Sequence, residues 1–180
     1  MKIIIKENSD LIIERYPQFK SLNKGLKEDY LKADFSESFI RSVQGKHSSY
    51  QTSSPHIDKV SEWVIRILRE TYPHLMSPHL KLVRHSSWFS GYDIGEYATL
   101  HAHLPRSYSY VYYVQCPRGS SPLVFPTSGK KIKAEEGRVV IFPGHVHHCV
   151  PKNKCVGRIA LAGNLTTVDS VDIKNIVKYT

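Results

Sequence analysis

The sequence of 180 residues has no long apolar run, few cysteines and no low-complexity segment. No stretch approaches the roughly 18–20 consecutive apolar residues of a membrane-spanning helix. The N-terminal MKIIIK is too short for the core of a signal peptide, and no small-residue cleavage site follows it. These absences predict a soluble, cytoplasmic protein that has no membrane partner and forms one domain over residues 1–180.

Cysteine occurs only three times, as Cys116, Cys149 and Cys155, and no C-x-x-C motif is present. Cys149 and Cys155 could face each other across the turn at 150–154. An odd number of cysteines in a cytoplasmic protein nevertheless favours reduced thiols.

Acidic residues are scarce in the second half of the chain, and none occurs between positions 97 and 134. Of the formal net charge of +9, residues 1–96 contribute +2 and residues 97–180 contribute +7. A basic half could attract an acidic partner, such as nucleic acid, an anionic cosubstrate or a phosphorylated metabolite. Before any motif is considered, a solvated lysine surface that keeps the protein soluble is the preferred interpretation.

The first part of the chain, residues 1–77, is predicted to form a helical layer. Val60, Trp63, Val64, Ile67 and Leu68 follow helical spacing and form one apolar stripe. Ser54 and Pro55 begin this helix and Pro73 ends it. We also expect shorter helices after Ser9 and around 37–43, and a strand over 2–6.

From position 78 the sequence pattern changes. Short segments rich in Val, Ile, Tyr and Phe alternate with turns that contain most of the glycines and prolines. The expected strands are 80–92, 97–103, 108–115, 121–126, 131–134, 138–142, 146–150 and 157–164. Eight short strands indicate a mainly β fold, a double-stranded β-helix or cupin-like jelly roll, over 78–166. Residues 167–180 form a C-terminal extension in which DIKNIVKY is a candidate helix.

Five of the ten histidines lie between positions 101 and 148. His101 and His103 are two residues apart in an expected strand, so both imidazoles point to the same side. A third histidine from a neighbouring strand would complete a three-ligand metal site that keeps positions open for substrate. Spacing alone does not decide between His145, His147 and His148.

Two ordered blocks resemble short bacterial and phage Fe(II)/2-oxoglutarate-dependent oxygenases over about residues 78–165. The first block, WFSGYDIGEYATLHAHLPRSYSYVYYV, matches at Trp88, Phe89, Tyr92, Gly95, Tyr97, His101, His103, Ser109, Val111, Tyr112 and Tyr113. The second block, EGRVVIFPGHVHHCVPKNKCVGRIALAGN, matches at Gly137, Phe142, Pro143, His148, Val150, Arg158 and Asn164.

The resemblance implies an Fe(II)- and 2-oxoglutarate-dependent dioxygenase that hydroxylates a C–H bond and releases succinate and CO₂. It implies that His101, His103 and His148 bind the iron and that Arg158 holds the distal carboxylate of 2-oxoglutarate, aided by Asn164. A guanidinium is a permanently charged, flat donor that matches a carboxylate. The implied partners are 2-oxoglutarate, O₂ and an unidentified primary substrate, for which an acidic molecule stays open and nucleic acid is not excluded.

Two positions depart from the pattern that this resemblance implies. The common ligand set is two histidines and one carboxylate, whereas His103 stands at the carboxylate position. Three neutral imidazoles would leave an Fe(II) site at +2, a charge that dianionic 2-oxoglutarate would reduce. Ala160 stands where many relatives have a serine that contacts the cosubstrate; Tyr112, Ser109 and Tyr97 are the candidates to replace it.

Other functions stay open at this point. GEYATLHAH also resembles the first cupin motif, so a cupin-type metalloenzyme with a three-histidine site is the nearest alternative, although it gives Arg158 no function. A Zn(II) hydrolase would lack an obvious general base. The alternative from another class is a non-catalytic basic module that binds nucleic acid or sugar.

The lysines at 130, 131, 133, 152 and 154 lie on expected turns and edge strands, where they keep a barrel soluble.

Overall fold

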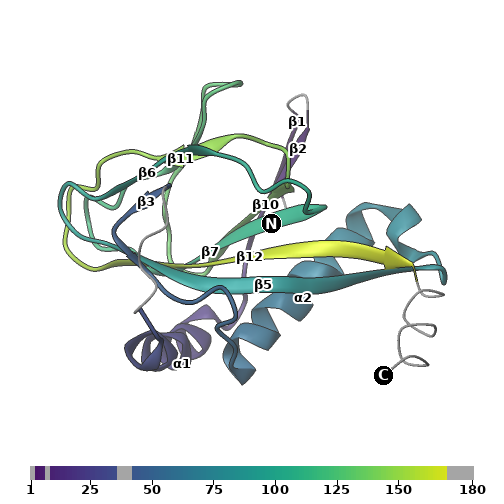
Figure 1. Ribbon diagram of the computed structural model, residues 1–180, viewed down its shortest axis with the longest axis horizontal. Coiled ribbons are helices and arrows are strands. Elements are labelled where there is room, and N and C mark those ends of the chain that lie inside the picture. The colour runs from purple at the N-terminus through teal and green to yellow at the C-terminus, as the bar shows by residue number, and fades with distance from the viewer. Residues whose placement is uncertain (1–2, 7–8, 36–41, 170–180) are drawn as a thin grey trace.

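The computed structural model describes residues 3–6, 9–35 and 42–169. Within them two antiparallel sheets face each other, and α1 and α2 lie on the outer side of the larger sheet (Figure 1). The large sheet has the order β1-β2-β10-β7-β12-β5-β4 and the small sheet the order β3-β6-β11-β8-β9. This is the jelly-roll fold that the sequence predicts.

The elements have the following bounds. The helices are α1 (Phe19–Lys32), α2 (Pro55–Thr71) and the 3-10 turn η1 (Pro73–Met76). The large sheet contains β1 (Ile3–Lys6), β2 (Asp10–Arg15), β4 (Lys46–His47), β5 (Leu80–Tyr92), β7 (Tyr108–Gln115), β10 (Arg138–Pro143) and β12 (Arg158–Asp169). The small sheet contains β3 (Val43–Gln44), β6 (Tyr97–His101), β8 (Leu123–Phe125), β9 (Lys130–Ile132) and β11 (His148–Val150). Eight strands form after position 78 near the expected positions, and the last runs on to Asp169. The strand expected over 97–103 ends at His101, so His103 lies in the loop after it and not in the strand.

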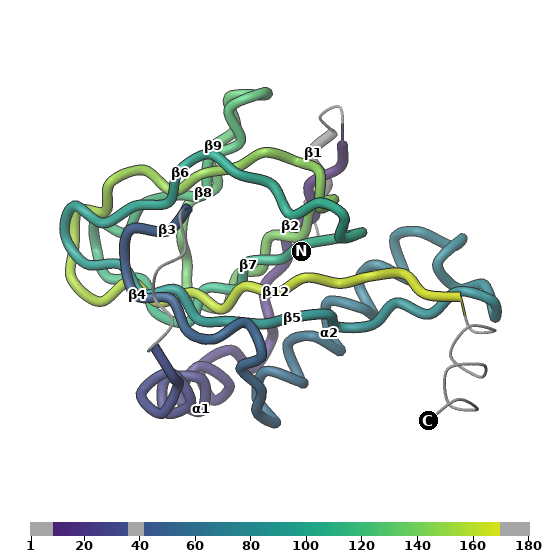
Figure 2. Tube along the Cα trace, in the orientation of Figure 1, coloured from purple at the N-terminus to yellow at the C-terminus, as the bar shows by residue number. Residues whose placement is uncertain are grey.

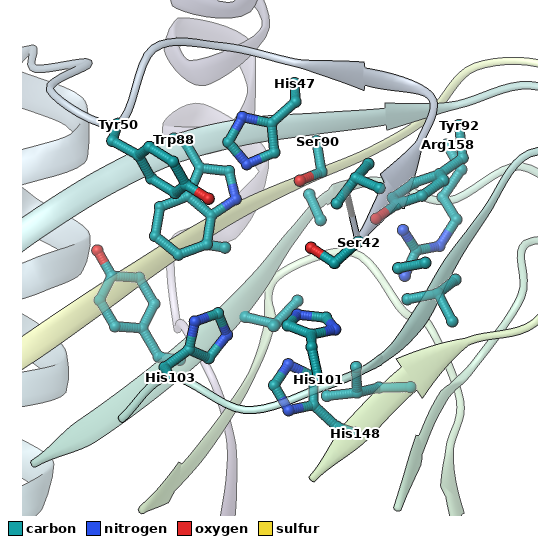
Figure 3. Close-up of a pocket in the computed structure, with 18 residues that line it drawn as sticks. Ser42, His47, Tyr50, Trp88, Ser90, Tyr92, His101, His103, His148 and Arg158 are labelled. Carbon is teal, nitrogen blue, oxygen red and sulfur yellow. The ribbon is translucent and has the colours of Figure 1, made fainter. Parts of the chain in front are cut away.

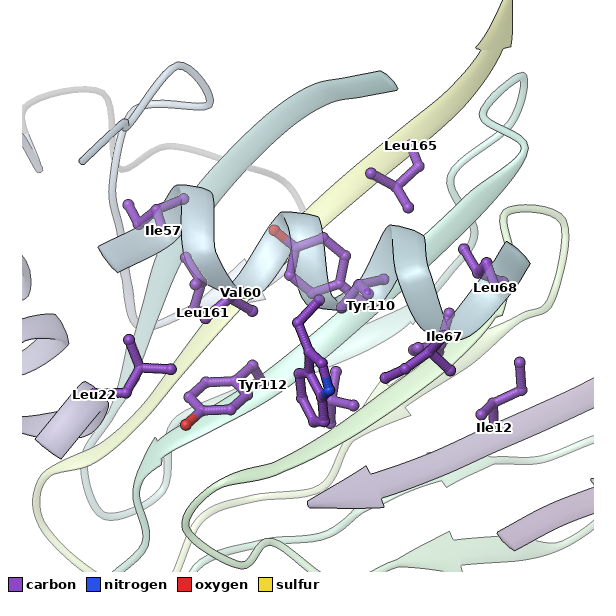
Figure 4. Close-up of a cluster of buried hydrophobic side chains, with 14 of the residues drawn as sticks. Ile12, Leu22, Ile57, Val60, Ile67, Leu68, Tyr110, Tyr112, Leu161 and Leu165 are labelled. Atoms are coloured by element: carbon purple, nitrogen blue, oxygen red, sulfur yellow. The ribbon is translucent and has the colours of Figure 1, made fainter. Parts of the chain in front are cut away.

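Helix α2 forms as its sequence predicts. The Ser54 hydroxyl accepts a hydrogen bond from the Ile57 amide, and Pro55 occupies the first helical position. The apolar stripe Val60, Trp63, Val64, Ile67 and Leu68 is buried against the outer face of the large sheet. This core between helix and sheet includes Tyr110, Tyr112, Leu161 and Leu165 (Figure 4).

The helix expected directly after Ser9 is wrong. That segment is strand β2, which lies between β1 and β10, and the helix begins only at Phe19. Leu11 and Ile13 pack in the core between the sheets, whereas Ile12 packs beneath the helices. A strand buried on both faces reads as a continuous apolar run, so the alternation that marks a strand is missing.

The N-terminal part is therefore a helical layer that also contributes β1, β2, β3 and β4 to the two sheets. The helix expected around 37–43 lies largely outside the described residues, although Val43 itself belongs to β3. The candidate helix in DIKNIVKY also lies outside them.

All three cysteines are free. No helix in the described ranges is long and apolar enough to span a bilayer.

The chain trace shows the strands of the small sheet facing those of the large sheet (Figure 2). Side chains alternate along β12, so Arg158, Ala160, Ala162 and Asn164 face the small sheet, whereas Leu161 and Leu165 face the helices. The pairing of β12 with β5 places Tyr92, Ser90 and Trp88 directly beside the first three of these inward residues. The inner face of the large sheet is thus the floor of the candidate site.

Candidate active site

The small sheet brings three of the predicted histidines together. His101 at the end of β6 lies opposite His148 at the start of β11, and their ring centroids are 4.3 Å apart. His103 follows two residues later, with its ring centroid 5.1 Å from each of the other two. One ring nitrogen from each histidine lies within 4.8 Å of the other two. Three imidazoles that converge in this way can hold one metal ion.

The loop that carries His103 is fixed by a close backbone approach. The His103 amide donates a hydrogen bond to the Gly144 carbonyl at 2.7 Å. A Cβ atom at Gly144 would collide with the carbonyl of Arg106, so only glycine permits this approach. Gly144, which directly follows β10, therefore helps to position the histidine loop.

Backbone carbonyls fix the orientation of two of the three imidazoles. Nδ1 of His101 donates to the Thr99 carbonyl at 2.7 Å, and Nδ1 of His148 donates to the Val146 carbonyl at 3.0 Å. Because a carbonyl only accepts, the proton of each neutral ring sits on Nδ1 and leaves Nε2 with a free lone pair. This arrangement is typical of metal-ligating histidines.

Burial keeps all three imidazoles neutral at physiological pH. Loss of hydration lowers the pKa of His101, lowers that of His103 to about 4 and holds that of His148 well below its ordinary value. Their mutual proximity lowers each of the pKa values of His103 and His148 further. Neutral imidazole is the form that binds a metal.

Arg158 is the second feature of the site. It begins β12, is 1% exposed, and donates from Nε to the Ser121 carbonyl at 3.1 Å. Its guanidinium carbon lies 4.9 Å from the ring centre of Tyr92 and 5.4 Å from that of Tyr113. Nη1 and Nη2 of Arg158 and the Tyr113 hydroxyl are buried without a hydrogen-bond partner in the described chain. Buried donors without partners are costly, so this cluster fits an anionic ligand.

A single pocket between the two sheets connects the histidines to Arg158. Figure 3 shows the three histidines and Arg158 around this pocket. Ala160 and Ala162 also line it, and their small side chains leave space there. At its other side the pocket is lined by His47, Tyr50 and Trp88. Burial lowers the pKa of His47 to about 4, so this imidazole is also neutral.

The structure separates the other predicted cofactor residues from this pocket. Tyr112 faces the helices, where its hydroxyl donates to Asn23 Oδ1 at 2.7 Å. Ser109 and Asn164 face the interior and hydrogen-bond to each other at 2.8 Å, but neither lines the pocket with Arg158. Tyr97 pairs with Gln44 across β6 and β3 and likewise does not line it. His145 and His147 are exposed beside the buried His148.

Sequence reasoning missed Tyr113 as a contact of Arg158, and His47 and Tyr50 as pocket residues. Tyr113 is adjacent to Tyr112 in a strand, so exactly one of the pair faces Arg158, and the alternation does not say which. The pairing of Ala160 with Tyr113 provides the answer, because Ala160 lies two residues from Arg158 on the same face. His47 and Tyr50 come from a short edge strand and the loop after it, and no motif marks them.

Comparisons by sequence find no relative. No family model matches the chain, and no curated protein matches it at significant similarity.

Solved structures with the same fold do exist. A viral collagen prolyl hydroxylase from Paramecium bursaria Chlorella virus 1, in complex with 2-oxoglutarate, is 18% identical with a TM-score of 0.64, covering 85% of this chain and 94% of that one. A Pseudomonas putida prolyl-4-hydroxylase is 15% identical with a TM-score of 0.64, covering 87% and 91%. A Trichoplax adhaerens prolyl hydroxylase, in complex with a hypoxia-inducible-factor peptide, is 14% identical with a TM-score of 0.63, covering 86% and 82%. At these identities the likeness establishes that this chain has the jelly-roll fold of 2-oxoglutarate oxygenases.

Proposed function

We propose that this protein is an Fe(II)- and 2-oxoglutarate-dependent dioxygenase that hydroxylates a C–H bond of its primary substrate. The observation that carries the proposal is one pocket that contains both three converging neutral imidazoles and a buried guanidinium with two unpaired nitrogens. The first group suits a metal ion and the second a carboxylate. A cupin-type metal site would leave the cost of burying Arg158 unexplained.

The donor set fits iron. Imidazole nitrogen is a ligand of non-haem Fe(II), and three facial ligands leave positions for a chelating cosubstrate and O₂. The metal-binding group among the described residues consists of His101, His103 and His148, which supports His103 as the third ligand. The bound metal would supply the oxidation of the C–H bond, coupled to decarboxylation of 2-oxoglutarate to succinate.

The residues of this chain would bind and orient the cosubstrate. Arg158 would donate from Nη1 and Nη2 to the distal carboxylate, and the Tyr113 hydroxyl would donate a further hydrogen bond. Ala160 and Ala162 leave room for the carbon chain between this end and the histidines. Burial of Arg158 excludes water from the carboxylate and strengthens its interaction with the guanidinium.

The test is formation of succinate from 2-oxoglutarate by purified protein with Fe(II) and O₂, alone and with proline-containing peptides, because the structural neighbours named above are prolyl hydroxylases. We expect turnover that requires Fe(II) and falls at least about a hundredfold in His148→Ala and Arg158→Ala, the scale of losing metal or substrate positioning. His145→Ala is the matched control, because this exposed histidine lies three residues from His148 and outside the pocket. Turnover without iron, or turnover retained in both variants, would contradict the proposal.

A further inference from the structure

The proposed function assigns 2-oxoglutarate to Arg158 and a metal ion to the histidines, and it assigns no molecule to the side of the pocket remote from Arg158. It is formed by three rings, His47, Tyr50 and Trp88, which we call the aromatic wall (Figure 3). The three rings come from β4, from the loop after it and from the middle of β5. The hydroxyl-bearing Ser42 and Ser90 line the pocket near them.

The aromatic wall is a preformed surface next to the metal ligands. His47 stacks on Trp88 with centroids 5.5 Å apart and an interplanar angle of 17°, and Tyr50 meets both rings edge-on at 4.9 Å. Trp88 in turn contacts His103, with centroids 5.7 Å apart. His47 and Trp88 are 1% and 5% exposed, whereas Tyr50 is 41% exposed. Tyr50 therefore lies where the wall meets solvent, and a group bound against the wall would lie beside the metal ligands.

The charges of the described pocket residues disfavour a cationic occupant. No carboxylate lines the pocket among the described residues, and its one permanently charged group is Arg158 at the opposite end. An ammonium group bound beside the aromatic wall would lose its hydration without gaining a counterion. Aromatic faces and serine hydroxyls instead suit an uncharged group.

His47 adds a directional contact to the aromatic wall. Its Nδ1 donates to the Ser48 carbonyl at 2.7 Å, so Nε2 of the neutral ring is a hydrogen-bond acceptor. Within the described chain Nε2 makes no hydrogen bond, and the ring lines the pocket. An N–H or O–H of a bound molecule would satisfy it.

We propose that the aromatic wall binds the primary substrate and selects an uncharged ring that carries a hydrogen-bond donor, with Tyr50 as the specificity-determining residue at the entrance. This proposal rests on the proposed function, because it assigns the second substrate to the same site. It names the chemical class that is presented to the metal.

Two small probes that share a ring and differ in charge test the proposal: benzyl alcohol and benzylammonium, added to the purified full chain. Trp88 reports binding by its fluorescence, because it lines the pocket, whereas the other tryptophan, Trp63, lies in the core beneath the helices and outside the pocket. We expect saturable binding of benzyl alcohol at millimolar concentration, about the range that so few atoms permit. Benzylammonium should bind at least about tenfold more weakly, since it enters without a counterion.

Variants of Tyr50 test its assignment. Tyr50→Ala should weaken benzyl alcohol at least about fivefold through loss of the ring contact, and Tyr50→Phe should retain binding. Leu31→Ala, at an 80% exposed position on α1, is the control and should bind like the unmodified chain. Equal binding of the two probes, or unchanged binding in Tyr50→Ala, would overturn the proposal. Because fluorescence needs no turnover, absence of iron-dependent succinate would count against the proposed function alone.

Discussion

Burial of the Arg158 guanidinium lowers the free energy of unfolding of the ligand-free protein. Nη1 and Nη2 lose their hydrogen bonds to water on folding and find no acceptor in the described chain. Replacing a buried charge by an apolar side chain of similar size is often neutral or stabilising. We therefore expect Arg158→Met to leave the unfolding free energy of the ligand-free protein unchanged, or to raise it by about 1–2 kcal/mol. The same variant should lose the stabilisation that 2-oxoglutarate confers on the unmodified protein.

Thermal denaturation with and without 2-oxoglutarate checks both parts of this expectation. Arg138→Met is the matched control, because Arg138 binds Glu135 and the Lys133 carbonyl at the surface and should keep the response to 2-oxoglutarate. A loss of more than about 2 kcal/mol in Arg158→Met would show that the arginine holds the fold together, contrary to this account.

The adjacent tyrosines of β7 allow cosubstrate binding and stability to be separated. Tyr113→Phe removes a buried hydroxyl that has no partner in the described chain, so stability should not fall, whereas KM for 2-oxoglutarate should rise about tenfold, as for one hydrogen bond to a charged group. Tyr112→Phe removes the hydrogen bond to Asn23, which should cost about 1 kcal/mol of stability without a change in KM. Steady-state kinetics and chemical denaturation measure the two effects. The opposite pattern would mean that Tyr112 contacts the cosubstrate.

At the scale of single elements, local pattern predicts well where an apolar stripe or flanking turn residues mark the limits of an element. Helix α2 has one buried stripe, and the strands after position 78 are Val-, Ile-, Tyr- and Phe-rich segments between glycines and prolines, so their approximate positions could be predicted. The pattern fails at β2, because one face packs beneath the helices and the other in the core between the sheets, so no alternation marks it as a strand. It also cannot choose between Tyr112 and Tyr113, because that choice depends on the pairing of β7 with β12, about fifty residues away.

Docking of helix α2 on the large sheet depends on one glycine of β12. The Tyr110 ring lies over Gly163, and its hydroxyl forms a hydrogen bond of 2.9 Å with Ser61 of α2. A Cβ atom at Gly163 would collide with this ring, so Gly163→Ala should displace Tyr110 and lower the unfolding free energy by about 1–3 kcal/mol. Chemical denaturation measures the loss.

Tyr110→Phe separates packing from hydrogen bonding in this contact. It removes only the hydroxyl and should cost about 1 kcal/mol. If Gly163→Ala lowered the unfolding free energy no more than Tyr110→Phe does, the packing of the Tyr110 ring on Gly163 would not contribute to stability, contrary to this prediction.

At the scale of the whole molecule, the fold collects the candidate site from both sheets, so its residues are distant in sequence. The three histidines belong to the small sheet and the loop after β6, Arg158 and Tyr113 to the large sheet, and His47 to its edge. Of the positively charged residues between positions 97 and 169, Arg158 alone is fully buried in the pocket. The charge that matters for the proposed chemistry is thus internal, and the surface lysines contribute a general field.

The buried histidines make the stability of the ligand-free protein depend on pH. His47 and the three candidate ligands have pKa values below that of an unfolded histidine, about 6.5. As pH falls below about 6.5, the unfolded chain therefore takes up protons that the folded chain does not, and stability decreases toward the folded pKa values, which are about 4 for His47 and His103. Stability should be full at pH 7 and lower at pH 4, by on the order of 1–3 kcal/mol from His47 alone.

The variant His47→Gln isolates the contribution of His47 to the pH dependence of stability, because it leaves the candidate metal ligands unchanged. Glutamine does not titrate, so urea denaturation of the variant between pH 7 and pH 4 should show a shallower decline than that of the unmodified protein, by about 1–3 kcal/mol over the range. Because the proton uptake belongs to the unfolded chain, the two curves should run parallel above pH 7 and diverge only below about 6.5. Parallel curves throughout would mean that His47 titrates alike in both states and that the aromatic wall does not keep it neutral.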